Sequence, residues 1–266
     1  MRFVDILPSW CSSGAHRDSL CDRSRAVSTE GLAFESVHLS RDGRRIFDDL
    51  SLHLRERRIG LVGDNGSGKS TLLRLANGLL VPERGDVIVK GRRTTQSRGE
   101  LHADVGFVFQ NPDHQIIFPT VGEEIAFGLI ERGETTARAR RAAEDLLTRQ
   151  GCAGWIDRAI HELSEGQKQL VCILAILATG PTILLLDEPF SSLDLPTRLS
   201  LSARLAQLPQ QILMASHDLD LLLDFDRVLW LESGQVRADG APSQVLPEYR
   251  AHAKARGAIM LESGAA

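Results

Sequence analysis

One stretch of nine residues decides the fold of this chain: Gly63-Asp64-Asn65-Gly66-Ser67-Gly68-Lys69-Ser70-Thr71. The stretch has the pattern G-x-x-x-x-G-K-[ST], which forms a phosphate-binding loop when it joins a strand to a helix. An apolar run at 59–62 precedes it and a helix-forming run at 72–76 follows, so this context is present. The alternative is a tight turn with a surface lysine, and both flanks argue against it.

The residue types in this loop are suited to holding a triphosphate. Its glycines let the backbone N–H groups point inward around a phosphate, and the N-terminus of the next helix adds a partial positive charge. Lys69 is placed to reach the β- and γ-phosphates, and the Ser70 hydroxyl is a ligand for Mg²⁺. We therefore expect the loop to bind ATP together with Mg²⁺.

A second site element is an apolar run that ends in two carboxylates, Asp187 and Glu188. A buried parallel strand delivers such acids to the carboxyl edge of the sheet, where ligands bind in open α/β folds. We expect Asp187 to hold Mg²⁺ through water, and Glu188 to orient and activate the attacking water. The alternative is a strand that ends and turns at Pro189.

A third element lies between these two, at Leu163-Ser164-Glu165-Gly166-Gln167, directly before an apolar helix. Ser164 is a good N-cap residue, and polar residues follow it in the first turn. A helix N-terminus with a serine and a glycine is a second place for an anion. The alternative is simply a capped helix.

The remaining pattern predicts an α/β fold. Strands are expected at 34–39, 50–54, 85–91, 105–109, 183–186 and 211–215, with a hairpin over 228–237 and helical structure over 120–158. This order predicts a parallel sheet core, an antiparallel β layer near the N-terminus and a helical insert in the middle. We expect a poorly ordered extension at 1–30, an ATPase domain at 31–240 with a helical subdomain at about 111–165, and a tail at 241–266.

Composition limits the location and the partners. The chain has 266 residues and a formal net charge of −4, which gives no overall attraction to nucleic acid. The longest apolar run, Leu170–Ala178, is too short to span a bilayer. The four cysteines form no C-x-x-C pair, which fits a reduced compartment. We expect a cytosolic chain that can sit on a membrane-embedded partner.

In order and spacing, these elements resemble the nucleotide-binding subunits of ATP-binding-cassette (ABC) transporters over about residues 32–240. The resemblance adds three further pieces: Gln110 in Phe-Gln-Asn-Pro, Asp194 in Ser-Leu-Asp, and His217 in Ser-His-Asp. By itself, a histidine after a strand is more often structural. The combination implies the P-loop ABC ATPase fold with a helical signature subdomain.

The resemblance also implies a mechanism. Two subunits pack head to tail, and the signature residues of one act on the ATP held by the other: Ser164, Glu165, Gly166 and Gln167. Gln110 would contact Mg²⁺ and the attacking water, and would link the site to a transmembrane partner. His217 would hydrogen-bond the γ-phosphate. Asp194 would connect the two sites across the dimer.

The segments 109–121 and 123–128 are similar to those of energy-coupling-factor importers, which take up vitamins or the ions of cobalt and nickel. Within that group the chain looks most like the ATPases of biotin importers. This implies a peripheral protein on the cytoplasmic face of the membrane, partnered by a second ATPase subunit, a transmembrane coupling protein and a substrate-binding membrane protein. The alternatives are a cobalt or nickel importer, a soluble ABC ATPase acting on ribosomes or DNA, and a regulatory domain that binds ATP without hydrolysing it. Glu188 argues against the last.

Two positions depart from the family pattern. Glu165 replaces the usual glycine of the signature, so its carboxylate is expected to point away from the phosphates. The aromatic residue that stacks on adenine is missing, and the turn before the loop has Arg41 in its place. A guanidinium plane can stack on a base. We leave open whether Arg41 does so, with weak base discrimination, or is a solvated turn residue.

Overall fold

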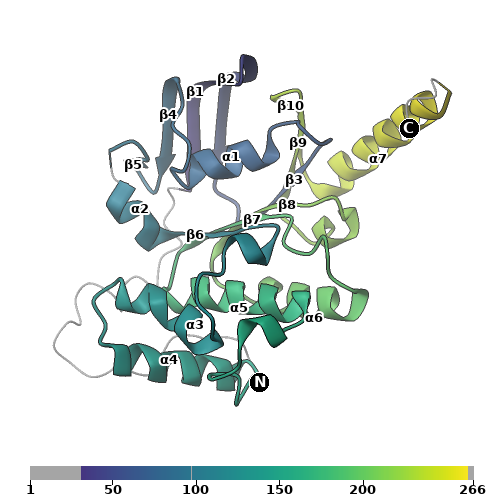
Figure 1. Cartoon of the computed structure of the whole chain (residues 1–266). Coiled ribbons are helices and arrows are strands. Elements are labelled where there is room, and N and C mark those ends of the chain that lie inside the picture. The colour runs from purple at the N-terminus through teal and green to yellow at the C-terminus, as the bar shows by residue number, and fades with distance from the viewer. Residues whose placement is uncertain (1–30, 97, 263–266) are drawn as a thin grey trace. The chain divides into compact units, whose positions relative to one another are not determined.

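A computed structural model describes residues 31–96 and 98–262 of the chain (Figure 1). It separates into two compact units. The loop unit is drawn from residues 30–98 and 212–266 and contains the phosphate loop. The helical unit comprises residues 99–211 and contains the signature and the acidic strand. We describe each unit by itself.

The antiparallel layer of the loop unit has the strand order β2-β1-β4-β5. Its strands are β1 (Leu32–Arg41), β2 (Arg44–Leu54), β4 (Arg84–Val89) and β5 (Arg92–Arg93). The turn between β1 and β2 places Asp42 at φ 51° and Gly43 at φ 74°. Two consecutive positive φ angles characterise the two-residue turn that matches the twist of a β-hairpin. The antiparallel layer predicted near the N-terminus is confirmed.

The parallel part of the loop unit is built around β3 (Arg58–Val62), all of whose residues are buried. β3 pairs in parallel with β8 (Gln211–Ala215) on one side and β9 (Arg227–Glu232) on the other. β10 (Gln235–Gly240) returns antiparallel along β9. Burial of every residue is typical of a parallel strand covered on both faces. The carboxyl end of β3 leads into the phosphate loop and then α1 (Lys69–Ala76).

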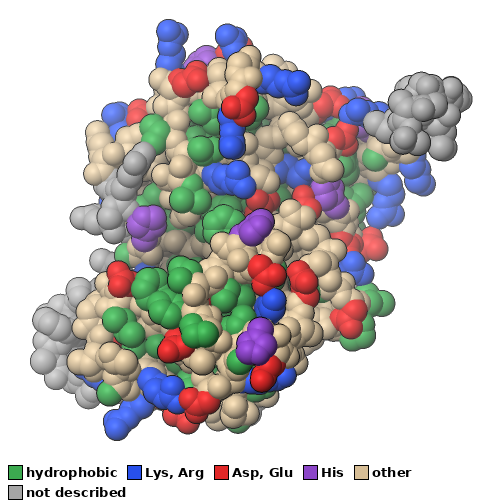
Figure 2. Space-filling model, viewed as in Figure 1, with side chains coloured by type: hydrophobic (Ala, Val, Ile, Leu, Met, Phe, Trp, Pro, Cys, Tyr) green, Lys and Arg blue, Asp and Glu red, His purple; other side chains and the backbone are tan. Residues whose placement is uncertain are grey.

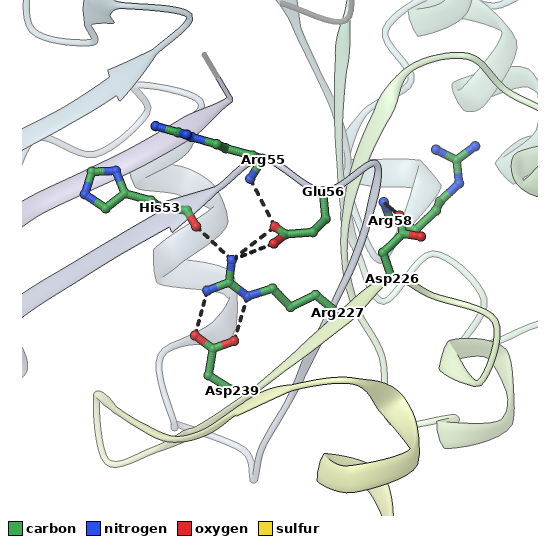
Figure 3. Close-up of polar contacts among 7 residues, drawn as sticks. All are labelled: His53, Arg55, Glu56, Arg58, Asp226, Arg227 and Asp239. Carbon is green, nitrogen blue, oxygen red and sulfur yellow. Dashed lines mark hydrogen bonds and ion pairs between the residues drawn. The ribbon is translucent and has the colours of Figure 1, made fainter. Parts of the chain in front are cut away.

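An arginine ties the loop unit together at the start of β9 (Figure 3). Arg227 donates two hydrogen bonds of 2.6 Å to the carboxylate of Asp239, and its third nitrogen reaches Glu56 at 3.0 Å and the His53 carbonyl at 2.8 Å. These contacts, led by the hydrogen bonds to Asp239, raise the pKa of Arg227 above its usual value. Nearby, burial lowers the pKa of Arg58 to about 10.

The helical unit has two parallel strands, β6 (Val105–Val108) and β7 (Ile183–Asp187). Its helices are α2 (Arg98–Asp104), α3 (Val121–Ile130), α4 (Thr136–Arg149), α5 (Glu165–Ala178) and α6 (Leu195–Ala206). Within the segment expected to be helical over 120–158, the structure has two helices, α3 and α4, separated by Gly133 at φ 92°. Because α4 ends at Arg149, the helical prediction for 150–158 is wrong. Apolar side chains from α3, α4 and α5 form one buried cluster.

The structure describes the two predicted terminal segments to different extents. The predicted extension at 1–30 lies outside the described residues. The segment predicted as a tail contains a long helix, α7 (Pro242–Glu262), which packs on β9. Among residues 31–96 and 98–262, no helix has both the length and the apolarity needed to cross a bilayer. The predicted α/β class, with a parallel sheet, an antiparallel layer and a helical subdomain, is confirmed.

Candidate active site

The phosphate loop packs too closely against neighbouring strands to tolerate side chains at two of its glycines. A Cβ on Gly63 would lie 2.2 Å from the carbonyl oxygen of Leu231 in β9, and one on Gly68 would lie 3.0 Å from the ring of Phe47. Both glycines also have positive φ angles, 147° and 108°. The hairpin turn adds a hydrogen bond of 3.1 Å from the Gly234 N–H to the Ser67 carbonyl. The loop is therefore held in shape by its surroundings.

Lys69 places a positive charge at this loop. Its side chain is buried, and its ammonium donates to the carbonyls of Gly63 at 2.6 Å and Asp64 at 3.1 Å. Gly68, the N-cap of α1, has no side chain to accept a bond from the first-turn N–H groups. A helix N-terminus that lacks a capping side chain and lies beside a lysine favours an anion.

The Ser67 hydroxyl in the same loop is buried and has no hydrogen-bond partner among the described residues. A bound nucleotide phosphate would supply that partner, so this hydroxyl is a further feature that fits a nucleotide.

For Mg²⁺, the predicted ligands Ser70, Gln110 and Asp187 are all oxygen donors, which this ion prefers. The described residues hold no group of three or more His, Cys, Asp and Glu suited to a metal. Mg²⁺ commonly binds to one or two protein oxygens plus substrate phosphates, so this donor set fits it.

His217 and Arg41, both in the loop unit, are each exposed. β8 runs parallel to β3, with Ala215 opposite Leu61. His217, two residues beyond Ala215, therefore comes from the same sheet edge as the phosphate loop. Arg41 ends β1, with its Nε 3.7 Å from Oδ2 of Asp42. Contact of His217 with the γ-phosphate and of Arg41 with adenine stay predictions.

In the helical unit, β6 and β7 bring Gln110 and Glu188 together. Both follow the carboxyl ends of paired parallel strands, and Gln110 Nε2 lies 3.5 Å from Glu188 Oε2 and 3.3 Å from Ser191 Oγ. Asp187 is buried at the end of β7. Glu188 has φ 50°, an uncommon backbone conformation for a residue other than glycine. Such strain is found at active sites, where the surroundings maintain it.

Three residues that the sequence did not single out position the loop around Gln110. The Phe109 N–H donates to Gln115 Oε1 at 3.1 Å, and Gln169 Nε2 donates to the Phe109 carbonyl at 3.3 Å. The buried Glu124 carboxylate accepts hydrogen bonds from the N–H groups of Ile117 and Phe118, at 2.9 and 3.0 Å. Gln115 and Glu124 lie inside the stretch that resembles energy-coupling-factor ATPases, so a signal existed for them.

The signature forms the N-terminus of α5. Ser164 and Gln167 satisfy each other's backbone N–H groups, at 3.3 and 3.1 Å, which is a capping box. A Cβ on Gly166 would lie 2.4 Å from Cγ2 of Thr197 in α6. The glycine therefore allows the N-termini of α5 and α6 to approach closely.

The unusual Glu165 has a partner on the segment before α6. Its Oε1 accepts a hydrogen bond of 3.3 Å from the Ser192 hydroxyl. Asp194 caps α6 by accepting the Thr197 N–H at 3.0 Å, and the hydrogen bonds from Thr197 hold the pKa of Asp194 below its usual range. The expectation that Glu165 points away from phosphate stays a prediction. Its carboxylate nevertheless has a local hydrogen-bond donor.

The chain is similar to known proteins over most of its length. The profile of the family described as ABC transporter matches residues 47–191. The chain is 53% identical to the biotin transport ATP-binding protein BioM of Rhodobacter capsulatus over 80% of this chain and 91% of that protein. It is 39% identical to the energy-coupling factor transporter ATP-binding protein EcfA of Methanothermobacter thermautotrophicus, over 72% of this chain and 64% of that protein.

Among solved structures, the chain resembles cbiO1 from Clostridium perfringens, described as part of the ABC transporter complex cbiONQ. The TM-score is 0.74 and the identity is 30%, over 85% of this chain and 94% of that one.

Proposed function

The chain belongs to the ABC transporter family, and from that membership we propose that it is the ATP-hydrolysing subunit of an energy-coupling-factor importer whose cargo is a vitamin, biotin. The cargo rests on one observation: the 53% identity to a biotin transport ATP-binding protein that this chain covers almost from end to end. The importer type is supported by the similarity to EcfA and by the Gln110 segment.

The position of each side chain in its own unit supports the role that we propose for it. Lys69 and the N–H groups at the start of α1 bind the β- and γ-phosphates. Glu188 acts as the general base that takes a proton from the attacking water, and Gln110, within 3.5 Å of it, orients that water. Ser70 in the loop unit and Asp187 in the helical unit are each proposed as ligands of Mg²⁺, which would neutralise phosphate charge.

The signature acts in trans, on the ATP of a second subunit. The N-terminus of α5 offers N–H groups and the Ser164 hydroxyl to a phosphate, while Lys168 in its first turn pairs with Asp113 at 2.7 Å. Two copies packed head to tail would each complete the other's site. ATP then stabilises the dimer and hydrolysis releases it, which is a population shift driven by ligand.

A membrane partner is supported by an exposed apolar surface on the helical unit. Ile117 is 71% exposed, and Phe127 and Ile130 of α3 are 36% and 37% exposed. Figure 2 shows hydrophobic side chains gathered on the surface in the region that Figure 1 assigns to α3. Exposed apolar clusters mark interaction sites. We place the chain on the cytoplasmic face of the membrane, bound there to a transmembrane coupling protein and, through it, to a substrate-binding membrane protein.

Two measurements test this function. The tagged chain is purified from detergent-solubilised membranes of its source and the co-purifying proteins are identified by mass spectrometry. Uptake of labelled biotin is compared in cells with the wild-type chain and with Lys69→Ala. Two small membrane proteins and uptake that depends on Lys69 are expected. Recovery with ribosomal proteins or nucleic acid would favour a soluble ATPase, and Lys69-dependent uptake of cobalt or nickel would replace biotin as the cargo.

A further inference from the structure

The carboxy-terminal helix α7 contacts the phosphate loop at the loop's second residue, Asp64. The guanidinium of Arg256 forms an ion pair with the Asp64 carboxylate. Tyr249, on the same helix, lies close enough to Asp64 that, after burial, the charge of this carboxylate contributes to raising the pKa of Tyr249. Positions 249 and 256 are seven residues apart, which is two turns, so they lie on one face of the helix. That face is directed at the loop.

Packing on β9 fixes the place of α7. The Tyr249 ring meets the buried Trp230 ring edge to face, with centroids 5.4 Å apart. The His252 ring lies 4.9 Å from Trp230, and Val245 is buried in the preceding turn. Since α7 is anchored in this way, the ion pair at Asp64 is a consequence of the fold.

The charge on Asp64 makes this contact relevant to nucleotide binding. An unpaired carboxylate beside bound phosphates would repel them. Arg256 supplies a compensating charge, although the two side chains are 45% and 39% exposed, so water screens part of the attraction. Asp64 also offers its carbonyl to Lys69 at 3.1 Å, which joins its position to that of the phosphate-binding lysine.

The second residue of α7 near Asp64 is Tyr249. It is buried, and burial, followed by the nearby Asp64 charge, raises the pKa of Tyr249. A tyrosine hydroxyl is a hydrogen-bond donor, so it is suited to lie beside a carboxylate.

We propose that Arg256 and Tyr249 are positioning residues for nucleotide binding, which act by neutralising the Asp64 carboxylate and fixing it away from the phosphates. The inference rests on the proposed function only in taking ATP as the ligand of the loop. Both residues lie beyond residues 47–191, the part that the family profile matches.

The test measures the dissociation constant of the purified full-length chain for a fluorescent ATP analogue in the presence of Mg²⁺. Arg256→Ala is expected to raise this constant about twofold to fivefold, as for loss of a partly exposed ion pair close to a charged ligand. Arg256→Lys should recover most of the affinity, and Tyr249→Phe should weaken binding less than Arg256→Ala. Arg256→Ala should therefore raise the dissociation constant but leave kcat at saturating nucleotide unchanged.

Arg250→Ala is the matched control, because Arg250 lies on the same helix and pairs with Asp220 at 3.1 Å. It removes the same charge without touching the loop and should bind nucleotide like the wild type. The effect of Arg256→Ala should also shrink in about 1 M salt, where the Debye length falls to about 3 Å.

A double-mutant comparison separates charge from packing. In an Asp64→Asn background, Arg256→Ala should cause no further loss of affinity, since there is no carboxylate left to neutralise. Equal affinity of Arg256→Ala and Arg250→Ala for the ATP analogue would overturn the inference. So would an equally large loss of affinity when Arg256→Ala is made in the Asp64→Asn background. A wild-type chain that binds no ATP would overturn the proposed function as well, so the two failures are distinguishable.

Discussion

Gln110 and Glu188 are 78 positions apart in the sequence, yet Gln110 Nε2 lies 3.5 Å from Glu188 Oε2. The contact exists because β6 and β7 pair in parallel and end at the same edge. An amide and a carboxylate this close can both hydrogen-bond one water molecule that lies beside them.

We predict that Gln110→Ala lowers kcat for ATP hydrolysis about tenfold to a hundredfold, because the amide no longer orients the attacking water. Nucleotide affinity should change little, since Gln110 lies at the reacting end of the site. Phosphate release measures kcat and equilibrium binding measures nucleotide affinity, and both are determined on one preparation. Wild-type turnover in Gln110→Ala would refute this role.

Gly166→Ala is expected to destabilise the helical unit. The new methyl would lie 2.4 Å from Cγ2 of Thr197, and overpacking of this kind costs about 1–3 kcal/mol. Thermal or urea unfolding measures the loss. Thr197→Ser removes the clashing methyl and should restore part of the stability. Gly257→Ala in α7 meets no atom within 4 Å and serves as the control. A fully stable Gly166→Ala protein would show that the two helices can separate freely.

Arg227→Ala should lower the free energy of unfolding by about 2–3 kcal/mol, because two carboxylates and a carbonyl lose their donor and Asp239 and Glu56 are left facing each other. Urea titration followed by circular dichroism measures this. Arg45→Ala is the control, since Arg45 is 67% exposed and pairs with the exposed Asp48. Equal effects of the two substitutions would contradict the importance of the Arg227 clamp.

The Cys172 thiol should resist alkylation in the folded protein. Burial raises the pKa of Cys172 to about 12, so almost no thiolate forms at pH 8. The folded pKa exceeds the unfolded value of about 8.5, so the resulting stabilisation is complete below about pH 8.5 and declines as pH rises toward 12. Iodoacetamide labelling with peptide mass mapping checks this, with urea-unfolded protein as the reactive control. Rapid native labelling at pH 8 would contradict it.

The local elements of this fold were predictable from local patterns. The phosphate loop with β3 and α1, the apolar strand ending at Asp187 and the hairpin of β9 and β10 all carry short-range signals: a motif, a continuous apolar run and a Ser-Gly turn. Helix α7 carries no such signal. Its sequence has Pro247 inside it and lacks a clear apolar stripe, and its place depends on Tyr249 packing against Trp230.

The residues of the candidate site were easier to predict than the contacts between them and their backbone conformations. Glu165 and Glu188 were both identified from the sequence, but the bond from Ser192 to Glu165 joins residues 27 positions apart, and no local rule pairs them. The backbone of Glu188, at φ 50°, opposes the ordinary preference of glutamate. Such a conformation is imposed by tertiary structure, so one sequence does not predict it.

We propose that Glu188 is the general base for ATP hydrolysis and that hydrolysis releases an ATP-bound dimer. The most direct measurement is ATP turnover by Glu188→Gln, together with its oligomeric state in ATP and Mg²⁺. We predict that turnover falls about a hundredfold or more while nucleotide still binds, and that a stable ATP-bound dimer accumulates. Undiminished turnover, or a monomer at saturating ATP, would contradict the account.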